Sequence, residues 1–251
     1  MAERPPIAVR DLTLAYGPNV VLRDVSFDVQ HSDVFVVIGG SGSGKSTLLR
    51  SLVGLLEPVS GDVSYQGQSL IQADAAERDR LLRRFGVLFQ SGALWSGMSL
   101  AENVALPLEE LTDLPRAEID ELVQLKLSLV GLRGFGDYLP NELSGGMRKR
   151  AGLARAMALD PEILFFDEPS SGLDPITARR LDELMLELRA SLDTTLVVVT
   201  HDLASIFAIG TDGVYLDADS KTVVARGSPQ RMLEHASDPR VRQFLTRGEE
   251  A

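Results

Sequence analysis

Cysteine is absent from the 251-residue chain, and tryptophan occurs only once. The absence of cysteine excludes disulfide bonds and metal sites built on thiolates, and little else. No apolar run approaches the roughly 18 residues that cross a bilayer. The first residues, 1–9, include two prolines and no apolar core of the kind found in secretory signals. We therefore expect the chain to act in the cytoplasm, with any membrane attachment supplied by another subunit.

Basic residues are also fewer than acidic residues. Lysine and arginine number 25 against 36 aspartates and glutamates, so the formal net charge is −11. A nucleic-acid-binding protein needs a basic stripe that displaces counterions from phosphates, and this balance argues against nucleic acid as a partner. It also argues against direct adhesion to an anionic membrane surface. An acidic surface that serves only solubility is an equally good explanation of the same excess.

Strand and helix patterns alternate along the chain, which indicates α/β architecture in a single domain over residues 1–251. Continuous apolar runs rich in branched residues are typical of parallel strands buried on both faces, and they occur at 34–38, 163–166 and 195–199. A helical pattern follows each run, at 45–55, 174–189 and 203–209.

Both ends and the middle of the chain depart from this alternation. An N-terminal antiparallel β-subdomain is predicted from strand patterns at 7–16, 20–29 and 61–71. Between about 90 and 158 the strand signal fades, and a helical insert is predicted from patterns at 99–108, 116–130 and 144–158. A C-terminal tail, about 227–251, carries helical candidates at 229–234 and 238–246.

A glycine-rich segment follows the first buried run. It satisfies the pattern G-x-x-x-x-G-K-[ST] between a strand and a helix. Glycines let the backbone wrap phosphates without Cβ clashes, and the helix N-terminus turns its N–H groups toward the anion. Lys45 should reach the β- and γ-phosphates, and the Ser46 hydroxyl should bind Mg²⁺. The residues predicted to bind nucleotide are Gly39, Gly40, Ser41, Gly42, Ser43, Gly44, Lys45, Ser46 and Thr47.

Two acidic residues follow the second buried run. Asp167 and Glu168 come at the carboxyl end of the strand, the edge at which α/β sheets bind their ligands. Asp167 would hold the Mg²⁺ shell, and Glu168 would polarise the attacking water as general base. Taken alone, two acids after a strand could equally begin an ordinary loop, and the glycine-rich segment favours the catalytic interpretation.

A shorter segment narrows the class of nucleotide hydrolase. Residues 143–147, Leu-Ser-Gly-Gly-Met, resemble the LSGGQ signature of the ABC (ATP-binding cassette) ATPase family. In that family the signature binds the γ-phosphate of ATP held by the partner subunit, which implies contacts in trans for Ser144, Gly145, Gly146 and Met147. Met147 departs from the usual Gln, and we expect the departure to be tolerated because the serine and glycines carry the phosphate contacts. From its chemistry alone, Ser144 is an N-cap, with or without a ligand.

Further positions resemble the family in the family's order. Tyr16 lies where the family stacks an aromatic ring on adenine, and Gln90 resembles the Q-loop glutamine that touches Mg²⁺ or water. Residues 171–174, Ser-Gly-Leu-Asp, resemble the D-loop, which crosses to the other subunit and places Asp174 in trans. His201 resembles the switch histidine that contacts the γ-phosphate. Each of these features also has a purely structural explanation. Tyr16 could be strand-end packing, and Gln90 could be an exposed loop amide. Residues 171–174 could be a capped turn, and His201 could be a strand-end histidine whose hydrogen bonds are satisfied.

The family resemblance runs from about residue 7 to residue 226. It implies a P-loop NTPase core with the N-terminal antiparallel β-subdomain and a helical signature subdomain. It also implies a homodimer that closes on two ATP and Mg²⁺, because one chain supplies half of each composite site. The basic run Arg148-Lys149-Arg150 is interpreted as the outer face of the signature helix.

Segments with less specific patterns than these motifs resemble one subfamily. It comprises the ATPases that serve MCE-type lipid transporters, known as the Mla (maintenance of lipid asymmetry) group. These segments are 88–95, 102–108, Met147, 174–177 and the tail near 237–248. The resemblance implies phospholipid cargo moved between inner and outer membranes. It implies a permease of the MlaE type, an MCE-domain lipid-binding protein and a small STAS-domain subunit as partners. The chain would then lie on the cytoplasmic face of the inner membrane, held there by the permease.

Two other interpretations of the function stay open at this point. One is the ATPase of a different importer, such as one for polar amino acids. The other is a soluble ABC protein without a permease, like the iron–sulfur assembly ATPase. The tail could be a dimer brace, a partner-binding segment or a frayed end. The resemblance favours an inter-subunit contact, in which case deletion of residues 237–251 should weaken complex assembly.

Overall fold

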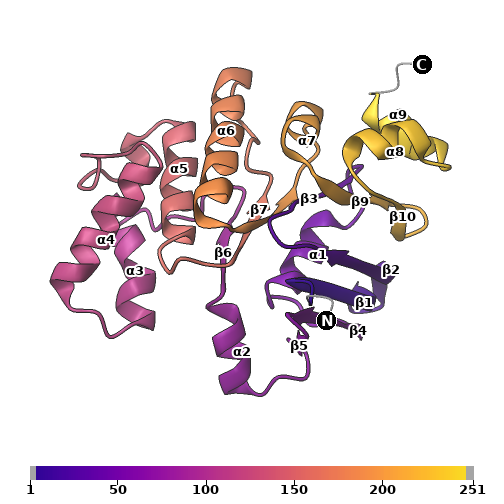
Figure 1. The fold of residues 1–251 in the computed structure, drawn as a ribbon, viewed down its shortest axis with the longest axis horizontal. Coiled ribbons are helices and arrows are strands. Elements are labelled where there is room, and N and C mark those ends of the chain that lie inside the picture. Colours follow the sequence, from indigo (N-terminus) through magenta and orange to yellow (C-terminus); the bar gives the residue numbers. More distant parts are fainter. Residues whose placement is uncertain (1–3, 247–251) are drawn as a thin grey trace.

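The computed structural model describes residues 4–246, which build two sheets (Figure 1). The smaller sheet is antiparallel, in the order β2-β1-β4-β5. Its strands are β1 (Ile7–Tyr16), β2 (Asn19–Val29), β4 (Ser60–Tyr65) and β5 (Gln68–Ser69). The antiparallel strands predicted at the N-terminus are therefore present. Asp11, at φ 48°, lies in a β-bulge of β1, and a Cβ on Gly61 would come within 2.4 Å of the Asp11 carbonyl oxygen.

The larger sheet has the order β10-β9-β3-β8-β7-β6. Its strands are β3 (Val34–Gly39), β6 (Phe85–Leu88), β7 (Ile163–Asp167), β8 (Thr195–Val199), β9 (Asp212–Asp217) and β10 (Thr222–Arg226). All neighbours are parallel except β10, which runs antiparallel to β9. The three buried strands expected from the apolar runs are confirmed as β3, β7 and β8. The sequence patterns did not predict β6, β9 or β10.

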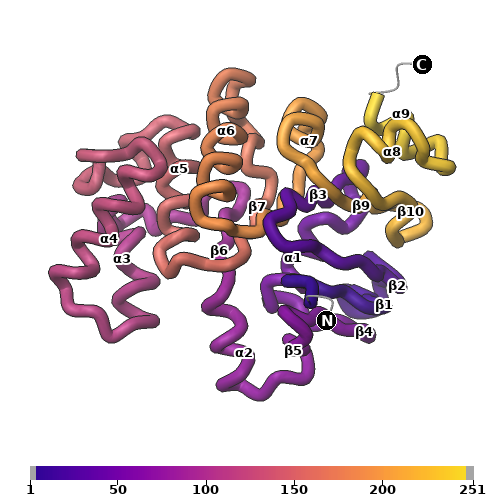
Figure 2. The backbone as a smooth tube through the Cα atoms, in the orientation of Figure 1, coloured from indigo at the N-terminus to yellow at the C-terminus, as the bar shows by residue number. Residues whose placement is uncertain are grey.

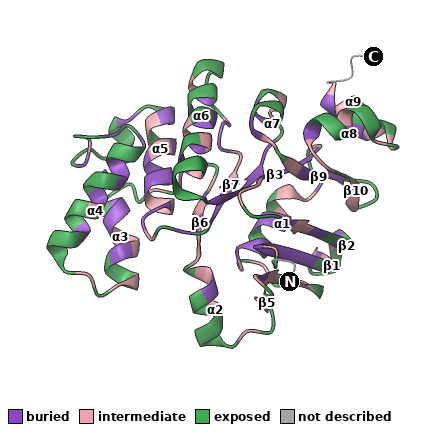
Figure 3. Ribbon diagram, viewed as in Figure 1, coloured by how far each residue is buried: buried purple, intermediate pink, exposed green. Residues whose placement is uncertain are grey.

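Both faces of the larger sheet are covered, as Figure 3 shows by the buried colour of its central strands. Val34, Val36 and Ile38 of β3 belong to one apolar cluster, whereas Phe35 and Val37 belong to the other. Alternate side chains of one strand thus enter two different cores. This is why the strand sequence is a continuous apolar run and not an alternation of apolar and polar residues.

The helices are α1 (Lys45–Leu52), α2 (Ala75–Leu82), α3 (Leu100–Leu111), α4 (Arg116–Leu129), α5 (Gly145–Ala156), α6 (Pro175–Leu192), α7 (Leu203–Ile209), α8 (Pro229–His235) and α9 (Pro239–Leu245). Of these, α2 was not predicted. Helices α6 and α7 cover one face of the larger sheet, and α1 with the smaller sheet covers the other (Figure 1). Helices α3, α4 and α5 gather beyond β6, and α8 and α9 return to lie beside β9 (Figure 2). Within residues 4–246, none of the helices combines the length and the apolar character that crossing a membrane requires.

A buried polar contact joins α6 to α7. Asp182 is 6% exposed, and its Oδ2 accepts a hydrogen bond from the Ser205 hydroxyl at 2.7 Å. Its Oδ1 has no hydrogen-bond partner among the described residues. Burial raises the pKa of Asp182 to about 6, against the opposing effect of the Ser205 hydrogen bond.

We expect Asp182→Asn to raise the free energy of unfolding by about 2 kcal/mol at pH 7.5. The folded-state pKa lies above the unfolded value, so the folded state keeps a proton between about pH 4 and pH 6 that the unfolded chain has lost. Stability from this group is therefore lost as pH rises through that window. Urea denaturation at pH 7.5 and pH 4 should show the gain only at the higher pH. Glu187→Gln, on the exposed face of α6, is the control, and a loss of stability in Asp182→Asn at pH 7.5 would contradict the expectation.

Candidate nucleotide-binding site

A cavity of about 590 Å³ opens where β3 passes into α1. Most of the glycine-rich segment lines it, together with residues from the loops after β6, β7 and β8. The lining residues are Val21, Gly39, Gly40, Ser41, Gly42, Gly44, Lys45, Ser46, Thr47, Gln90, Glu168, His201 and Phe244. The structure therefore brings the predicted P-loop, Gln90, Glu168 and His201 together around one space.

The backbone of the glycine-rich segment explains why glycine occurs there. Gly39 has φ 151°, and a Cβ on it would lie 2.3 Å from the Leu216 carbonyl oxygen of β9. Gly44, at φ 93°, caps α1 in the left-handed region, where residues with a Cβ are strained. Ser43 is buried and does not line the cavity. Its hydroxyl oxygen lies 2.7 Å from the position that a Cβ on Gly39 would occupy. Of the nine predicted P-loop residues, Ser43 is the one that does not line the cavity.

Lys45 begins α1 and lies across the glycine-rich loop. Its Nζ donates hydrogen bonds to the carbonyl oxygens of Gly39 at 2.9 Å and Gly40 at 2.8 Å. Burial lowers the pKa of Lys45, while the nearby carboxylates of Glu168 and Asp167 raise it. The ammonium is thus fixed by the backbone beside two carboxylates, in a position to meet an anion in the cavity.

Two oxygen groups suited to a divalent cation meet next to Lys45. The Ser46 hydroxyl donates to Asp167 Oδ1 at 3.2 Å, which joins the start of α1 to the end of β7. Burial raises the pKa of Asp167, and the hydrogen bond from Ser46 lowers it. Hydroxyl, carboxylate and phosphate oxygens are the ligands that Mg²⁺ prefers, so this pair fits the ion. The Gln90 amide, the third predicted ligand, donates to the Ser171 hydroxyl at 3.2 Å.

Glu168 and His201 lie next to each other just beyond the carboxyl ends of β7 and β8. Glu168 Oε1 lies 2.8 Å from His201 Nδ1, and the Glu168 side chain is only 12% exposed. The Glu168 backbone has φ 48°, a left-handed conformation that costs a non-glycine residue about 1 kcal/mol or more. Its N–H donates to the Val199 carbonyl oxygen at 2.8 Å, and this bond between neighbouring strands holds the strained residue in place. The carboxylate is therefore rigidly presented to the cavity.

Lys149 corrects one expectation. The basic run 148–150 was interpreted as an outer helix face, yet Lys149 is 6% exposed. Its Nζ donates to the Glu168 carbonyl oxygen at 3.2 Å and also to the Gln90 carbonyl oxygen. Burial lowers its pKa, and the Asp167 and Glu168 carboxylates oppose that shift. The Lys149 side chain contacts two loops that lie 59 and 19 residues away in the sequence, which no local pattern reveals.

We expect Lys149→Met to lower the rate of ATP hydrolysis about tenfold and to change the nucleotide dissociation constant by less than about twofold. Methionine keeps the length of the side chain but removes the charged donor of both carbonyls. The Glu168 carbonyl still accepts the Ser171 N–H at 3.1 Å, so the main loss, about 1–3 kcal/mol, falls on the Gln90 carbonyl. Steady-state phosphate release and an ADP titration separate the two effects. Lys149→Arg should restore most of the rate, and Arg150→Met on the same helix is the control. An unchanged rate in Lys149→Met would rule out a positioning role.

The residues predicted to act in trans lie apart from this cavity. Ser144 caps α5, and its hydroxyl accepts the Met147 N–H at 3.3 Å; neither residue lines the cavity of its own chain. Gly146 packs against Thr177, where a Cβ would lie 2.5 Å from Thr177 Cγ2. Asp174 caps α6 by accepting the N–H groups of Ile176 and Thr177 at 3.1 and 3.0 Å. These groups do not line the cavity of their own chain, and their contact with a nucleotide held by another copy stays a prediction.

Tyr16 ends β1 with its side chain 44% exposed, and its hydroxyl accepts a hydrogen bond from Arg50 Nη1 at 3.2 Å. It does not line the cavity, where β2 contributes Val21 on the side of the smaller sheet. The role of Tyr16 toward adenine stays a prediction.

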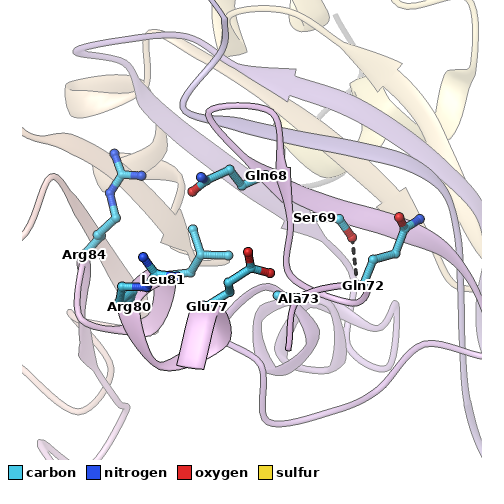
Figure 4. A pocket seen from close by; sticks show the side chains of 8 residues that line it. All are labelled: Gln68, Ser69, Gln72, Ala73, Glu77, Arg80, Leu81 and Arg84. Atoms are coloured by element: carbon cyan, nitrogen blue, oxygen red, sulfur yellow. Dashed lines mark hydrogen bonds between the residues drawn. The ribbon is translucent and has the colours of Figure 1, made fainter. Parts of the chain in front are cut away.

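A second cavity, of about 490 Å³, lies between β5 and α2 (Figure 4). Two of its three charged side chains already serve the fold. Glu77 closes the capping box of α2 with Asp74, and Arg84 forms a two-point ion pair with Glu162, which does not line the cavity. The predicted site residues do not line this cavity.

Residues 22–171 match the ABC transporter family. The chain is 43% identical over 239 residues to a probable ribonucleotide transport ATP-binding protein of Mycobacterium leprae, covering 95% of this chain and 68% of that protein. It is 41% identical to the intermembrane phospholipid transport system ATP-binding protein MlaF of Haemophilus influenzae, covering 95% of this chain and 89% of that protein. The chain thus spans about two thirds of the mycobacterial relatives and most of MlaF.

A solved structure agrees with the fold. The dimeric ATP-binding cassette MJ0796, in a post-hydrolysis state with ADP and Pi, superposes with a TM-score of 0.79 at 29% identity. The match covers 88% of this chain and 98% of that cassette. The α/β cassette architecture expected from the sequence motifs is confirmed.

Proposed function

This chain belongs to the ABC transporter family, and we propose that it is the ATPase subunit of a system that moves phospholipid between inner and outer membranes. ATP binding and hydrolysis coupled to transport follow from the family. The cargo rests on one observation, the match to MlaF proteins over 95% of this chain and 88–89% of theirs.

The geometry of the cavity and of the residues next to it supports a distinct role for each side chain. Lys45 would contact the β- and γ-phosphates, and Ser46, Asp167 and Gln90 would hold Mg²⁺, which neutralises phosphate charge when bound. Glu168 accepts the proton of the attacking water, because its carboxylate is buried at the rim and fixed by the Glu168 backbone. His201, 2.8 Å from Glu168, orients that carboxylate and contacts the γ-phosphate.

We further propose that two copies close around two ATP. Ser144 and the N–H groups at the start of α5 form an anion site that the same chain's P-loop does not reach. Two-fold symmetry brings the α5 N-terminus of each copy to the P-loop of the other. The γ-phosphate is then shared between subunits, so ATP favours the closed pair and ADP releases it.

The proposed partners are a permease of the MlaE type, an MCE-domain lipid-binding protein and a small STAS-domain subunit. The permease would hold this chain at the cytoplasmic face of the inner membrane. The loop after Gln90 supports a docking surface, since Trp95 is 61% exposed there and Asn103 of α3 fixes its backbone by accepting the Trp95 N–H at 2.8 Å. An exposed aromatic on a held loop is the kind of side chain that anchors protein interfaces.

The test is an affinity pull-down of the tagged chain from detergent-solubilised membranes of its native host, with mass spectrometry of proteins and lipids. We expect a multi-span permease, an MCE-domain protein and phospholipid to co-purify. Trp95→Ala should reduce recovery of the permease, whereas Tyr138→Ala, also an exposed aromatic, should not.

Other outcomes would change the proposal in different ways. Recovery of a permease that binds ribonucleotides, the cargo class in the name of the mycobacterial relative, would keep the ATPase and overturn the lipid assignment. Recovery of no membrane protein at all would favour a soluble ABC ATPase.

A further inference from the structure

The C-terminal helix α9 reaches the nucleotide cavity of its own chain. Phe244 lines that cavity with the P-loop, Glu168 and His201, although it lies more than 40 residues beyond His201 in the sequence. The ring is half-buried and packs edge-on against Tyr215, with ring centroids 5.4 Å apart. Tyr215 pairs with Ile38, the residue before the P-loop. One side of the Phe244 ring therefore rests on the sheet beside the loop, and another side faces the cavity.

Several contacts fix α9 in this position. Val241 and Leu245 are buried in the apolar cluster of the larger sheet. Arg240 Nη1 donates to Asp217 Oδ2 at 2.6 Å, and its Nη2 donates to Asp238 Oδ2 at 2.6 Å. Asp217 ends β9, one residue after Leu216, whose carbonyl oxygen leaves no room for a side chain on Gly39. The helix is thus tied to the strand that shapes the start of the phosphate loop.

We propose that α9 is a wall of the nucleotide site and that Phe244 excludes water from its phosphate end. The inference rests on the proposed nucleotide role of the P-loop and goes beyond it, because it assigns a positioning residue in the C-terminal segment. An apolar ring beside the loop lowers the local dielectric, which strengthens the attraction between Lys45, the loop N–H groups and a bound phosphate. The coupling is reciprocal, so a bound nucleotide stabilises the docking of α9.

The experiment uses the full-length chain and Mg·ADP, which removes any contribution from a γ-phosphate shared between subunits. Phe244→Ala should weaken ADP binding about fivefold by calorimetric titration, equivalent to roughly 1 kcal/mol. Arg240→Ala, which loosens the anchor, should weaken it in the same direction by about twofold. Phe207→Ala is the matched control, since this α7 phenylalanine is 38% exposed and does not line the cavity.

A second readout needs no substitution. Hydrogen exchange of the α9 amides in the wild-type chain should slow on saturation with Mg·ADP, while the α8 amides serve as the internal reference. Wild-type ADP affinity in Phe244→Ala, or α9 exchange that ADP does not alter, would overturn the inference. A wild-type chain that fails to bind ADP would instead defeat the P-loop assignment, and a different cargo would leave this test unaffected.

Discussion

Replacement of Lys45 by alanine should reduce ATP hydrolysis by at least about a thousandfold, the loss expected when a charged group aimed at transition-state charge is removed from a partly dry site. Lys45 Nζ lies 2.9 and 2.8 Å from the carbonyl oxygens of Gly39 and Gly40, so the backbone holds the ammonium over the loop. No other lysine or arginine lines the cavity among the described residues, so no neighbour replaces the lost charge. Phosphate release at saturating Mg·ATP measures the effect.

Controls separate this loss from damage to the fold. Alanine is a good residue for the first turn of α1, and the thermal unfolding midpoint of Lys45→Ala should stay within a few degrees of the wild type. Lys221→Ala is the matched variant, because Lys221 also donates to a backbone carbonyl, that of Val20 at 2.8 Å, without lining the cavity. Turnover by Lys45→Ala near the wild-type rate would show that the P-loop assignment is wrong.

The parts of the site that could be predicted from the sequence are segments of consecutive residues. The P-loop is a single segment between a buried strand and a helix, and Asp167 and Glu168 directly follow another buried strand. Because the carboxyl ends of parallel strands share one edge, the strand pattern alone brings these segments together. The same reasoning places His201, which follows β8, next to Glu168.

The parts that could not be predicted depend on contacts between distant segments. Burial of Lys149 follows from carbonyl groups of Gln90 and Glu168, 59 and 19 residues away, and its sequence neighbours Arg148 and Arg150 favour an exposed face. Strand β9 has only three consecutive apolar residues between its polar ends, and it pairs with β3 across more than 170 positions. Phe244 reaches the cavity because the chain after β10 returns through α8 and α9 to lie beside β9. The end of the tail, residues 247–251, lies outside the described residues.

Replacement of Glu168 by glutamine should slow hydrolysis by about 10²–10⁴-fold and leave ATP binding within about threefold of the wild type. A glutamine amide keeps the size of the side chain, and its oxygen can still accept a hydrogen bond from His201 Nδ1. It cannot take the proton of the attacking water, so the chemical step fails while the binding groups remain. Glu162→Gln, at the opposite end of β7, is the matched control, because Glu162 pairs with Arg84 away from the cavity. Single-turnover hydrolysis and an ATP titration measure the two quantities, and a wild-type rate would show that Glu168 is not the base.

The same variant also tests the shared γ-phosphate. If ATP joins the P-loop of one copy to Ser144 and the α5 N-terminus of another, blocked hydrolysis should trap the pair, and Glu168→Gln should elute as a dimer with Mg·ATP and as a monomer with Mg·ADP. Ser144→Arg replaces the hydroxyl that accepts the Met147 N–H at 3.3 Å by a bulky side chain at the α5 N-terminus. Added to Glu168→Gln, it should abolish the dimer without lowering ADP affinity. The cavity proposed to bind ADP is lined by residues of one chain that do not include Ser144, so the two effects separate. An ATP-dependent dimer that survives Ser144→Arg would mean that the subunits meet through another surface.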